Sequence, residues 1–229
     1  AVLSNHIGRK TCGLYYYNAG RSRLLKRESG MGRKESGKIM TESEELRRQG
    51  KESVIHQLNP HFIFNLMGAV RIAVRTDPEL AYDRLYDFSR YLRAVFRSLE
   101  SRENVSFREE VSDVRSFINL EKLRFGDRIR FRTDIKEEGF ALPPLSVMVL
   151  VDNALIHGLE KGERRGTITL RSYRMPSEYI VQVEDDGTGF DAKAYESLPG
   201  DDGPKAGGLL NARYRMETMV NGSMDIQSF

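Results

Sequence analysis

The sequence predicts an α+β chain in which an N-terminal helical hairpin precedes a two-layer α/β sandwich. Three observations predict it. Between about residues 41 and 99, apolar residues recur every three or four positions, which is the period of a helix. After Gly126 the pattern changes to the alternation of a strand with one buried face. Helical and strand patterns then follow one another, as in helices that cover one face of a sheet.

The composition is that of a globular protein. The 229 residues are 39% hydrophobic and 30% charged, which excludes wholesale disorder and a collagen-like structure. The longest uninterrupted apolar stretch, Val147 to Val151, is far shorter than the ~20 residues of a membrane-spanning helix. The single cysteine, Cys12, excludes an intrachain disulfide, so a reducing, cytoplasmic compartment is expected.

Residues 1–40 are basic and rich in Gly and Ser, and we interpret them as a tail or linker. They hold nine basic and two acidic side chains, although the net charge of the whole chain is only +3. A solvated tail, a juxtamembrane segment attracted to anionic lipid and a nucleic-acid-binding arm are the alternatives. No helix-turn-helix or zinc-finger pattern accompanies the charge, so no nucleic-acid partner is expected.

Residues 41–104 are predicted to form the helical hairpin. Thr41 and Glu44 make a capping-box pattern, and a helix follows to about Arg75. Pro60 lies inside this helical pattern, where it removes one backbone donor, so a kink is expected there.

The second helix of the hairpin is predicted to begin at Asp77 and Pro78, a cap followed by proline in the first turn. Its apolar residues step by three and four, which is the seam of a coiled coil: Leu85, Phe88, Leu92, Val95 and Leu99. One hairpin cannot bury both stripes well, whereas two hairpins make a four-helix bundle, so a homodimer is predicted.

Residues 105–229 are predicted to form the sandwich. The expected elements are a helix from Ser106 and Glu109 to about Arg124, a strand over Ile129–Ile135, a helix from Pro143-Pro144 to about His157, strands Thr167–Tyr173 and Tyr179–Glu184, a loop from Gly187 to Ala206, a helix from about Gly207 to Asn221-Gly222, and a final strand starting near Met224.

His61 is the first candidate for chemistry. It follows Pro60 directly and lies beside the apolar stripe of its helix. With an ordinary pKa of about 6.5, a neutral imidazole is available as a nucleophile at neutral pH. A helical histidine is more often a packing or surface residue, so this signal alone decides nothing.

Asp152, Asn153 and His157 are polar residues on an otherwise apolar helix. Asn153 and His157 are four positions apart and therefore share a face. Burying such groups without partners costs ~1–3 kcal/mol each, so we expect them to line a polar cleft. A satisfied hydrogen-bond network in the core is the alternative.

Two glycine-containing stretches could approach a ligand. Asp185 ends a predicted strand, where its carboxylate can accept from an amino group such as that of adenine, and Gly187 and Gly189 permit close backbone approach. Residues 207–211, Gly-Gly-Leu-Leu-Asn, open a helix whose bare N–H groups suit phosphate oxygens. An ordinary turn and a plain helix start are the alternatives.

Together these stretches resemble the sensor histidine kinases of the LytS type. Residues 57–65, Gln-Leu-Asn-Pro-His-Phe-Ile-Phe-Asn, look like that family's phospho-acceptor motif, Q-[IL]-x-P-H-F-[LI]-F-N. Residues 119–128 look like its linker to the ATPase domain, residues 151–158 like its N box, and residues 185–189 and 208–215 like its two glycine boxes. The resemblance covers roughly residues 50–229 and implies a Bergerat-type ATP-binding sandwich.

The resemblance implies that His61 is the phospho-acceptor and that ATP and Mg²⁺ are the cofactors. Asn153 would coordinate Mg²⁺, His157 would lie near the phosphates, and Asp185 would accept from the adenine amino group. Gly187 and Gly189 would make room for the base, and Gly208 would let the lid backbone approach the phosphates. The implied ATP-binding residues are Asp152, Asn153, His157, Asp185, Gly187, Gly189, Gly208, Leu209 and Asn211.

The resemblance also implies partners and a location. The hairpin would form the homodimer, and an aspartate of a cognate response regulator would receive the phosphoryl group. The basic N-terminus would join a membrane-anchored parent, which makes the chain the cytoplasmic portion of a membrane-bound sensor. The C-terminal end is expected to be truncated within the last strands. Phe62 follows His61, so the acidic neighbour that acts as general base in other histidine kinases is absent.

The chain departs from the family pattern at four positions, in three places. Asp152 replaces a Glu, Met148-Val149 replaces a Gln-Pro pair, and Ala206 stands where the second glycine box has its first Gly. A catalytically decayed, kinase-like signalling scaffold is therefore an alternative to an active kinase. An ATPase of the same superfold is a third, but it would place a Glu where this chain has Val149.

Overall fold

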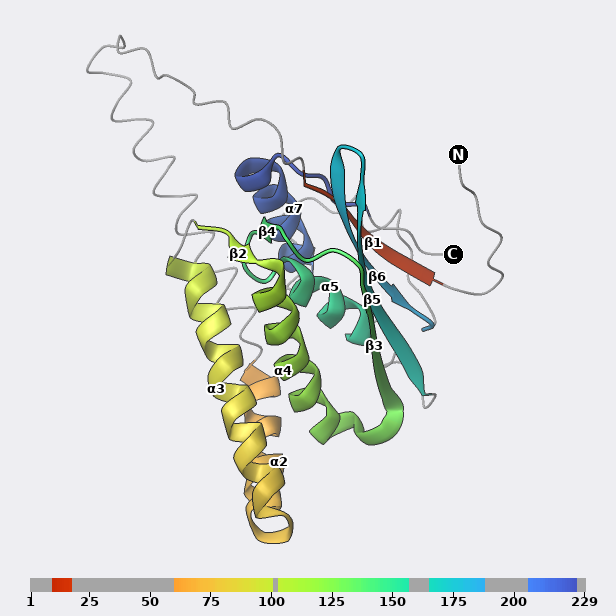
Figure 1. The fold of residues 1–229 in the computed structure, drawn as a ribbon. Coiled ribbons are helices and arrows are strands. Elements are labelled where there is room, and N and C mark those ends of the chain that lie inside the picture. Colours follow the sequence, from red (N-terminus) through yellow and green to blue (C-terminus); the bar gives the residue numbers. More distant parts are fainter. Residues whose placement is uncertain (1–9, 18–59, 101–102, 157–164, 188–205, 226–229) are drawn as a thin grey trace, which may run out of the picture.

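The computed structural model describes residues 10–17, 60–100, 103–156, 165–187 and 206–225. It confirms the predicted α+β class, because a helical hairpin projects from a sandwich of helices on a sheet (Figure 1). None of the helices in these ranges has the length and apolarity that a membrane-spanning segment needs.

The hairpin consists of α2 (Pro60–Thr76) and α3 (Pro78–Glu100). The helices of the sandwich are α4 (Phe107–Phe125), α5 (Ser146–Ala154) and α7 (Ala206–Val220), with a short 3₁₀ turn, η1 (Gly126–Arg128). The strands are β1 (Lys10–Tyr17), β2 (Val105–Ser106), β3 (Ile129–Ile135), β4 (Ala141–Leu142), β5 (Gly166–Met175) and β6 (Glu178–Asp185).

The predicted helix boundaries are set by local caps. Asp77 Oδ1 accepts the backbone N–H of Leu80 at 3.0 Å, which satisfies a donor in the first turn of α3. Ser106 Oγ accepts the backbone N–H of Glu109 at 3.2 Å and so caps α4. At the other end of α4, Gly126 has φ 58°, a conformation that glycine adopts at little cost, and its N–H donates to the carbonyl of Lys122.

Helix α4 is the element that joins the hairpin to the sandwich. On one side, three buried aromatic rings from α2, α3 and α4 pack together, with centroids 5.5 Å apart for Phe62–Tyr91 and 5.9 Å apart for Tyr91–Phe117. Nearby, the side chain of Asp113 is only 3% exposed and accepts from Arg90 Nε at 2.9 Å and from Arg97 Nη2 at 2.6 Å. The start of α2 is therefore held against α4 by packing of Phe62, and α3 is held against α4 by both packing and charge.

The main sheet has the order β1-β6-β5-β3. Strand β3 is parallel to β5, whereas β5–β6 and β6–β1 are antiparallel. A separate pair, β2 with β4, closes the start of α4. Helices α4, α5 and α7 lie on one face of the main sheet (Figure 1), and their apolar side chains form one core with buried strand residues such as Ile168, Leu170 and Val183.

Strand β1 was not predicted, because residues 10–17 lie within the basic segment interpreted as a tail or linker. It pairs antiparallel with β6, with Lys10 opposite Asp185, and shows an irregularity between Tyr15 and Tyr17. The final strand expected from Met224 is not formed up to Asp225, the last described residue of the chain. Met224 instead packs in the core at 6% exposure.

Helix α5 begins later than Pro143-Pro144 suggested. A residue before proline is disfavoured in the helical region, so Pro143 cannot start the helix. Leu145 then adopts a left-handed conformation with φ 64°, and the helix begins at Ser146. The predicted kink at Pro60 depends on residues before it, and the predicted helix end at His157 also lies outside the described residues.

Candidate active site

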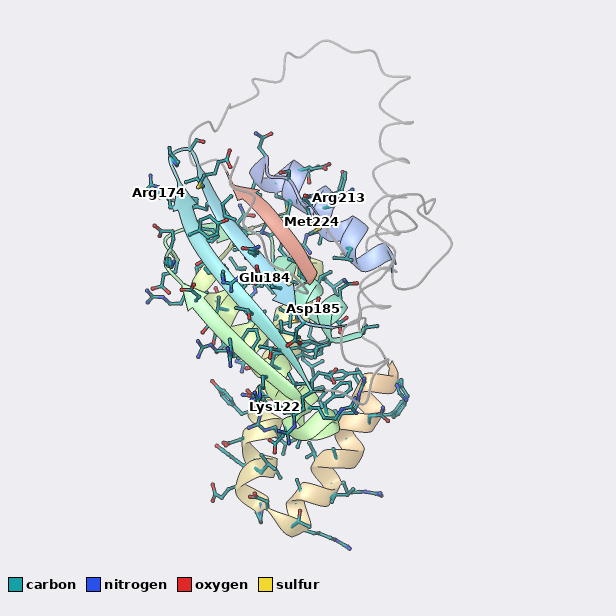
Figure 2. The ribbon with its side chains drawn as sticks, turned by 90° about the vertical axis from the view of Figure 1, so that its right-hand side faces the viewer. Lys122, Arg174, Glu184, Asp185, Arg213 and Met224 are labelled. Atoms are coloured by element: carbon teal, nitrogen blue, oxygen red, sulfur yellow. The ribbon has the colours of Figure 1, made fainter. Side chains whose placement is uncertain are left out.

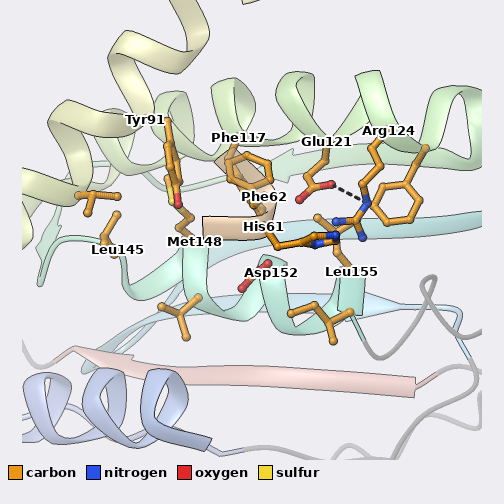
Figure 3. Close-up of a pocket in the computed structure, with 14 residues that line it drawn as sticks. His61, Phe62, Tyr91, Phe117, Glu121, Arg124, Leu145, Met148, Asp152 and Leu155 are labelled. Carbon is orange, nitrogen blue, oxygen red and sulfur yellow. Dashed lines mark ion pairs between the residues drawn. The ribbon is translucent and has the colours of Figure 1, made fainter. Parts of the chain in front are cut away.

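His61 lies in the first turn of α2, at the place where this helix meets α4 and α5 (Figure 3). Its side chain is exposed at the mouth of a cavity. One turn further along α2, Asn65 Nδ2 lies 3.1 Å from Nε2 and 3.4 Å from Nδ1 of the imidazole. Since an amide N–H donates, the contact fixes the ring with a lone pair turned to Asn65.

The cavity has a volume of about 250 Å³ and is enclosed by α2, α3, α4 and α5 of one chain. Its apolar wall comes from aromatic and aliphatic side chains of all four helices. Its polar lining consists of His61, Tyr91, Glu121, Arg124 and Asp152. The structure thus brings the predicted phospho-acceptor and a residue of the predicted N box to one cavity (Figure 3).

The hydroxyl of Tyr91 stays protonated in this cavity. Burial raises the pKa of Tyr91, and the negative charges of Asp152 and Glu121 raise it further. Both carboxylates line the same cavity as Tyr91, Glu121 from α4 and Asp152 from α5. Tyr91 is consequently a hydrogen-bond donor at neutral pH.

Glu121 and Arg124 form an ion pair on the α4 side of the cavity, with Nε and Oε2 3.7 Å apart. Glu121 is 5% exposed. The guanidinium of Arg124 also lies 4.1 Å from the ring centroid of Phe125, a cation–π distance. The pair therefore presents a buried carboxylate to the cavity that His61 also lines.

The start of α5 is capped by a side chain from another helix. Glu110 of α4 is 1% exposed and accepts backbone N–H groups from Leu145, Val147 and Met148 at 3.0, 2.9 and 3.3 Å. Burial raises the pKa of Glu110 to about 7, against the opposing effect of these three donors. The cap fixes the direction of the helix that carries Asp152 and Asn153.

Asn153 points elsewhere than Asp152. Consecutive residues of a helix are ~100° apart around its axis, and Asn153 does not line the cavity although Asp152 does. Asn153 is 8% exposed, so its amide is nearly buried. The two polar residues predicted as one group therefore serve two different surfaces of α5.

Asp185 ends β6, as the sequence predicted, and Figure 2 shows it at the end of the strand. Its Oδ1 accepts the backbone N–H of Gly187 at 2.9 Å. The next residue, Asp186, accepts the backbone N–H of Thr167 at 2.6 Å and so ties the turn to β5. The turn holds Asp185 on a fixed strand end, where one carboxylate oxygen is already used by the backbone.

Helix α7 begins at Ala206, next to the predicted helix start at Gly207. Gly208 and Asn211 are half-buried, whereas Leu209 is 3% exposed and packs in the core. The side chain of Leu209 is therefore part of the core and is not open to a ligand. His157 and Gly189 lie outside the described residues, as does the interior of the loop predicted from Gly187 to Ala206.

Sequence reasoning assigned no role to Tyr91, Glu121, Arg124 or Glu110. Glu121 and Arg124 belong to the stretch that resembles the family linker, and that membership was the one available signal for them. Tyr91 and Glu110 are placed at the site by the packing of α3 and α4, and no local sequence pattern predicts this packing.

Comparison with protein families supports the predicted resemblance. A family model described as "Histidine kinase" matches residues 52–129, which include the acceptor motif and α4. The sensor histidine kinase YpdA of Escherichia coli (strain K12) is 28% identical over 224 residues, 97% of this chain and 39% of YpdA. The chain is also 33% identical to YwpD of Bacillus subtilis (strain 168) over 75% of this chain and 63% of YwpD.

The sensor protein LytS of Staphylococcus saprophyticus is 28% identical over 166 residues, which are 72% of this chain and 27% of LytS. The chain thus spans between about a quarter and two thirds of the length of these relatives. The matched family, these relatives and the motif at residues 57–65 support the predicted resemblance to the LytS-type sensor histidine kinases.

Proposed function

We propose that the chain autophosphorylates His61 with Mg-ATP and passes the phosphoryl group to an aspartate of a response regulator. The observation that carries this proposal is the shared cavity of His61 and Asp152. An acceptor imidazole and the helix of the predicted nucleotide site meet there within one chain. Phosphoryl transfer depends mainly on such positioning of the nucleophile.

The chain's own residues prepare the nucleophile. Asn65 holds the imidazole of His61 through its amide N–H, at 3.1 Å from the nearer ring nitrogen. A neutral imidazole has one nitrogen lone pair, so the amide N–H of Asn65 must leave this nitrogen before the lone pair attacks phosphorus. Phe62, Tyr91 and Phe117 pack together and form an apolar wall of the cavity that His61 lines.

Nucleotide binding is assigned to the sandwich. Asp185 would accept from the adenine amino group, and Asn153 would hold Mg²⁺ through its amide oxygen. Such an oxygen suits Mg²⁺, which takes one or two protein ligands together with waters and substrate phosphates. When bound, the metal ion would neutralise the charge that develops on the phosphates. Asp152, His157, Gly187, Gly189, Gly208, Leu209 and Asn211 complete the proposed ATP-binding set.

Partners follow from the hairpin surface. Large apolar side chains are exposed on α2 and α3, among them Phe64 at 76%, Tyr82 at 72% and Leu85 at 46%. A second hairpin would cover them in a four-helix bundle, so we propose a homodimer. His61 is itself exposed and accessible to the aspartate of a response regulator. We also propose that the chain works as the cytoplasmic part of a membrane-anchored sensor.

The proposal is tested by incubating the chain with γ-labelled ATP and Mg²⁺. The wild type should acquire an acid-labile label that His61→Gln does not acquire, because phosphohistidine is hydrolysed in acid. Absence of label on a folded wild type would refute the kinase and leave the non-catalytic scaffold. A His61→Gln chain that takes up the same label would place the acceptor elsewhere.

A further inference from the structure

The proposed transfer assigns no role to Glu121, although this carboxylate lines the same cavity as His61. Its side chain is only 6% exposed. Taking a carboxylate out of water costs several kcal/mol unless charges or hydrogen-bond donors compensate. Polar groups of this cavity must therefore interact with Glu121 to compensate for the lost hydration of its carboxylate.

Arg124 supplies part of this compensation. Its Nε lies 3.7 Å from Glu121 Oε2, which is an ion-pair distance but too long for a hydrogen bond. A carboxylate can accept about four hydrogen bonds, so the pair with Arg124 leaves capacity for another donor. Figure 3 shows the His61 ring between Glu121 and Arg124 on the α4 side and Asp152 on the α5 side.

The chemistry of the acceptor calls for such a group. The lone pair of one ring nitrogen forms the N–P bond, and the bond from the γ-phosphorus to the bridging oxygen breaks, so that ADP leaves with that electron pair. The other ring nitrogen carries an N–H, and the ring becomes positively charged as the bond forms. A carboxylate on that N–H stabilises the charge and can take the proton, while the residue after His61 is Phe62.

Asp152 is less suited to this role. It is the neighbour of Asn153 on the helix that bears the proposed metal ligand, so its negative charge belongs to the nucleotide side. Glu121 lies on α4, which carries neither the N box nor a glycine box. It approaches the histidine from the side opposite α5 (Figure 3).

We propose that Glu121, held by Arg124, accepts the ring N–H of His61, orients the imidazole and takes its proton during phosphoryl transfer. This inference rests on the proposed function. It supplies the proton acceptor that the sequence next to His61 does not provide. After transfer, the proton leaves Glu121 for solvent through the exposed side of His61.

The test compares single-turnover labelling by γ-labelled Mg-ATP in the wild type, Glu121→Gln and Glu138→Gln. Glu138 is a matched control, because it is an exposed carboxylate in an ion pair with Arg108 and does not line the cavity. Glu121→Gln should slow labelling about 100-fold, the usual size of a lost proton acceptor. Its ATP affinity by calorimetry should match the wild type, and Glu138→Gln should label at the wild-type rate.

Two further readouts separate proton transfer from packing. The difference in labelling rate between the wild type and Glu121→Gln should become smaller from about pH 7 to about pH 9, because hydroxide replaces the missing carboxylate as proton acceptor. Glu121→Ala should be partly rescued by formate, which the cavity can hold, whereas the wild type should not respond. Glu121→Asp keeps the carboxylate and should retain the wild-type pH profile of labelling. This variant tests the proposal if the other variants fail to fold.

The outcomes are distinct. Labelling of Glu121→Gln at the wild-type rate overturns the role of Glu121. If the Glu121→Gln chain is slowed by the same factor at every pH and formate does not rescue Glu121→Ala, Glu121 acts through packing and its role as proton acceptor is overturned. A Glu121→Asp chain with an altered pH profile also overturns this role. A wild type that takes no label refutes the proposed function itself.

Discussion

Glu110 of α4 and Val147 of α5 are joined by a buried hydrogen bond, in which the backbone N–H of Val147 donates to Oε1 at 2.9 Å. The same carboxylate accepts the N–H of Leu145 at 3.0 Å. Leu145 supplies no side-chain cap to α5, so Glu110 replaces the usual N-cap residue. Through this contact, the direction of the helix that carries Asp152 and Asn153 depends on α4.

The stability of the chain should depend on pH through Glu110. Burial raises its pKa from 4.5 to about 7. Between these values the folded chain holds a proton that the unfolded chain has lost, so the unfolding free energy falls as pH rises. Denaturant unfolding at about pH 5 and about pH 8 should show the wild type losing about 3 kcal/mol more than Glu110→Gln, which has no proton to lose. Equal pH dependence of the two proteins would contradict the ionisation of a buried Glu110.

The cavity predicts phosphorylation within one subunit. His61 and Asp152 of the same chain line it, so a nucleotide bound beside Asp152 would meet the histidine of its own chain. Mixed dimers of a His61→Gln chain with an Asn153→Ala chain should therefore take up no label from γ-labelled ATP. As a control, dimers of wild-type and His61→Gln chains should carry label on the wild-type chain. Label on the Asn153→Ala chain would instead show transfer between subunits.

The connection between hairpin and sandwich should depend on Asp113. This carboxylate is 3% exposed and pairs with Arg90 at 2.9 Å and with Arg97 at 2.6 Å. Asp113→Asn removes the charge that both arginines face, and breaking such a pair costs about 3 kcal/mol of unfolding free energy. The exposed pair of Arg108 and Glu138 provides the comparison, because Glu138→Gln should cost less than about 1 kcal/mol. If denaturant unfolding shows the same loss of unfolding free energy for Asp113→Asn and Glu138→Gln, the buried pairs of Asp113 stabilise the chain no more than an exposed pair does.

The helix ends could be predicted from the sequence because their causes are local. Asp77, Ser106 and Gly126 each act within one turn of the chain, through a side-chain cap or a positive φ. The acceptor motif around His61 is equally local and could be recognised from its residues. The structural effect of such local residues does not depend on contacts with distant parts of the chain.

The arrangement of the site could not be predicted, because it depends on contacts between distant segments. Acidic residues in a helix are usually exposed, so nothing in the sequence marks Glu110 and Glu121 as buried. Their environment exists only once α4 packs against α5 and α2. Strand β1 is a similar case, since its residues lie in a basic segment and its pairing partner, β6, lies near the other end of the chain.

The exposed apolar surface of the hairpin predicts a dimer that a charge should disrupt. Leu85 is 46% exposed on α3, unlike Val95 of the same predicted seam, which is buried within the chain, so a second hairpin would bury Leu85 in the proposed bundle. Leu85→Glu would place a carboxylate in that interface and should shift the chain to a monomer in analytical ultracentrifugation. Met175, at the end of β5 in the sandwich, is similarly exposed at 47%, and Met175→Glu should leave the dimer intact. A Leu85→Glu chain that sediments as the wild-type dimer would show that the dimer uses another surface, and a wild-type monomer would contradict the four-helix bundle.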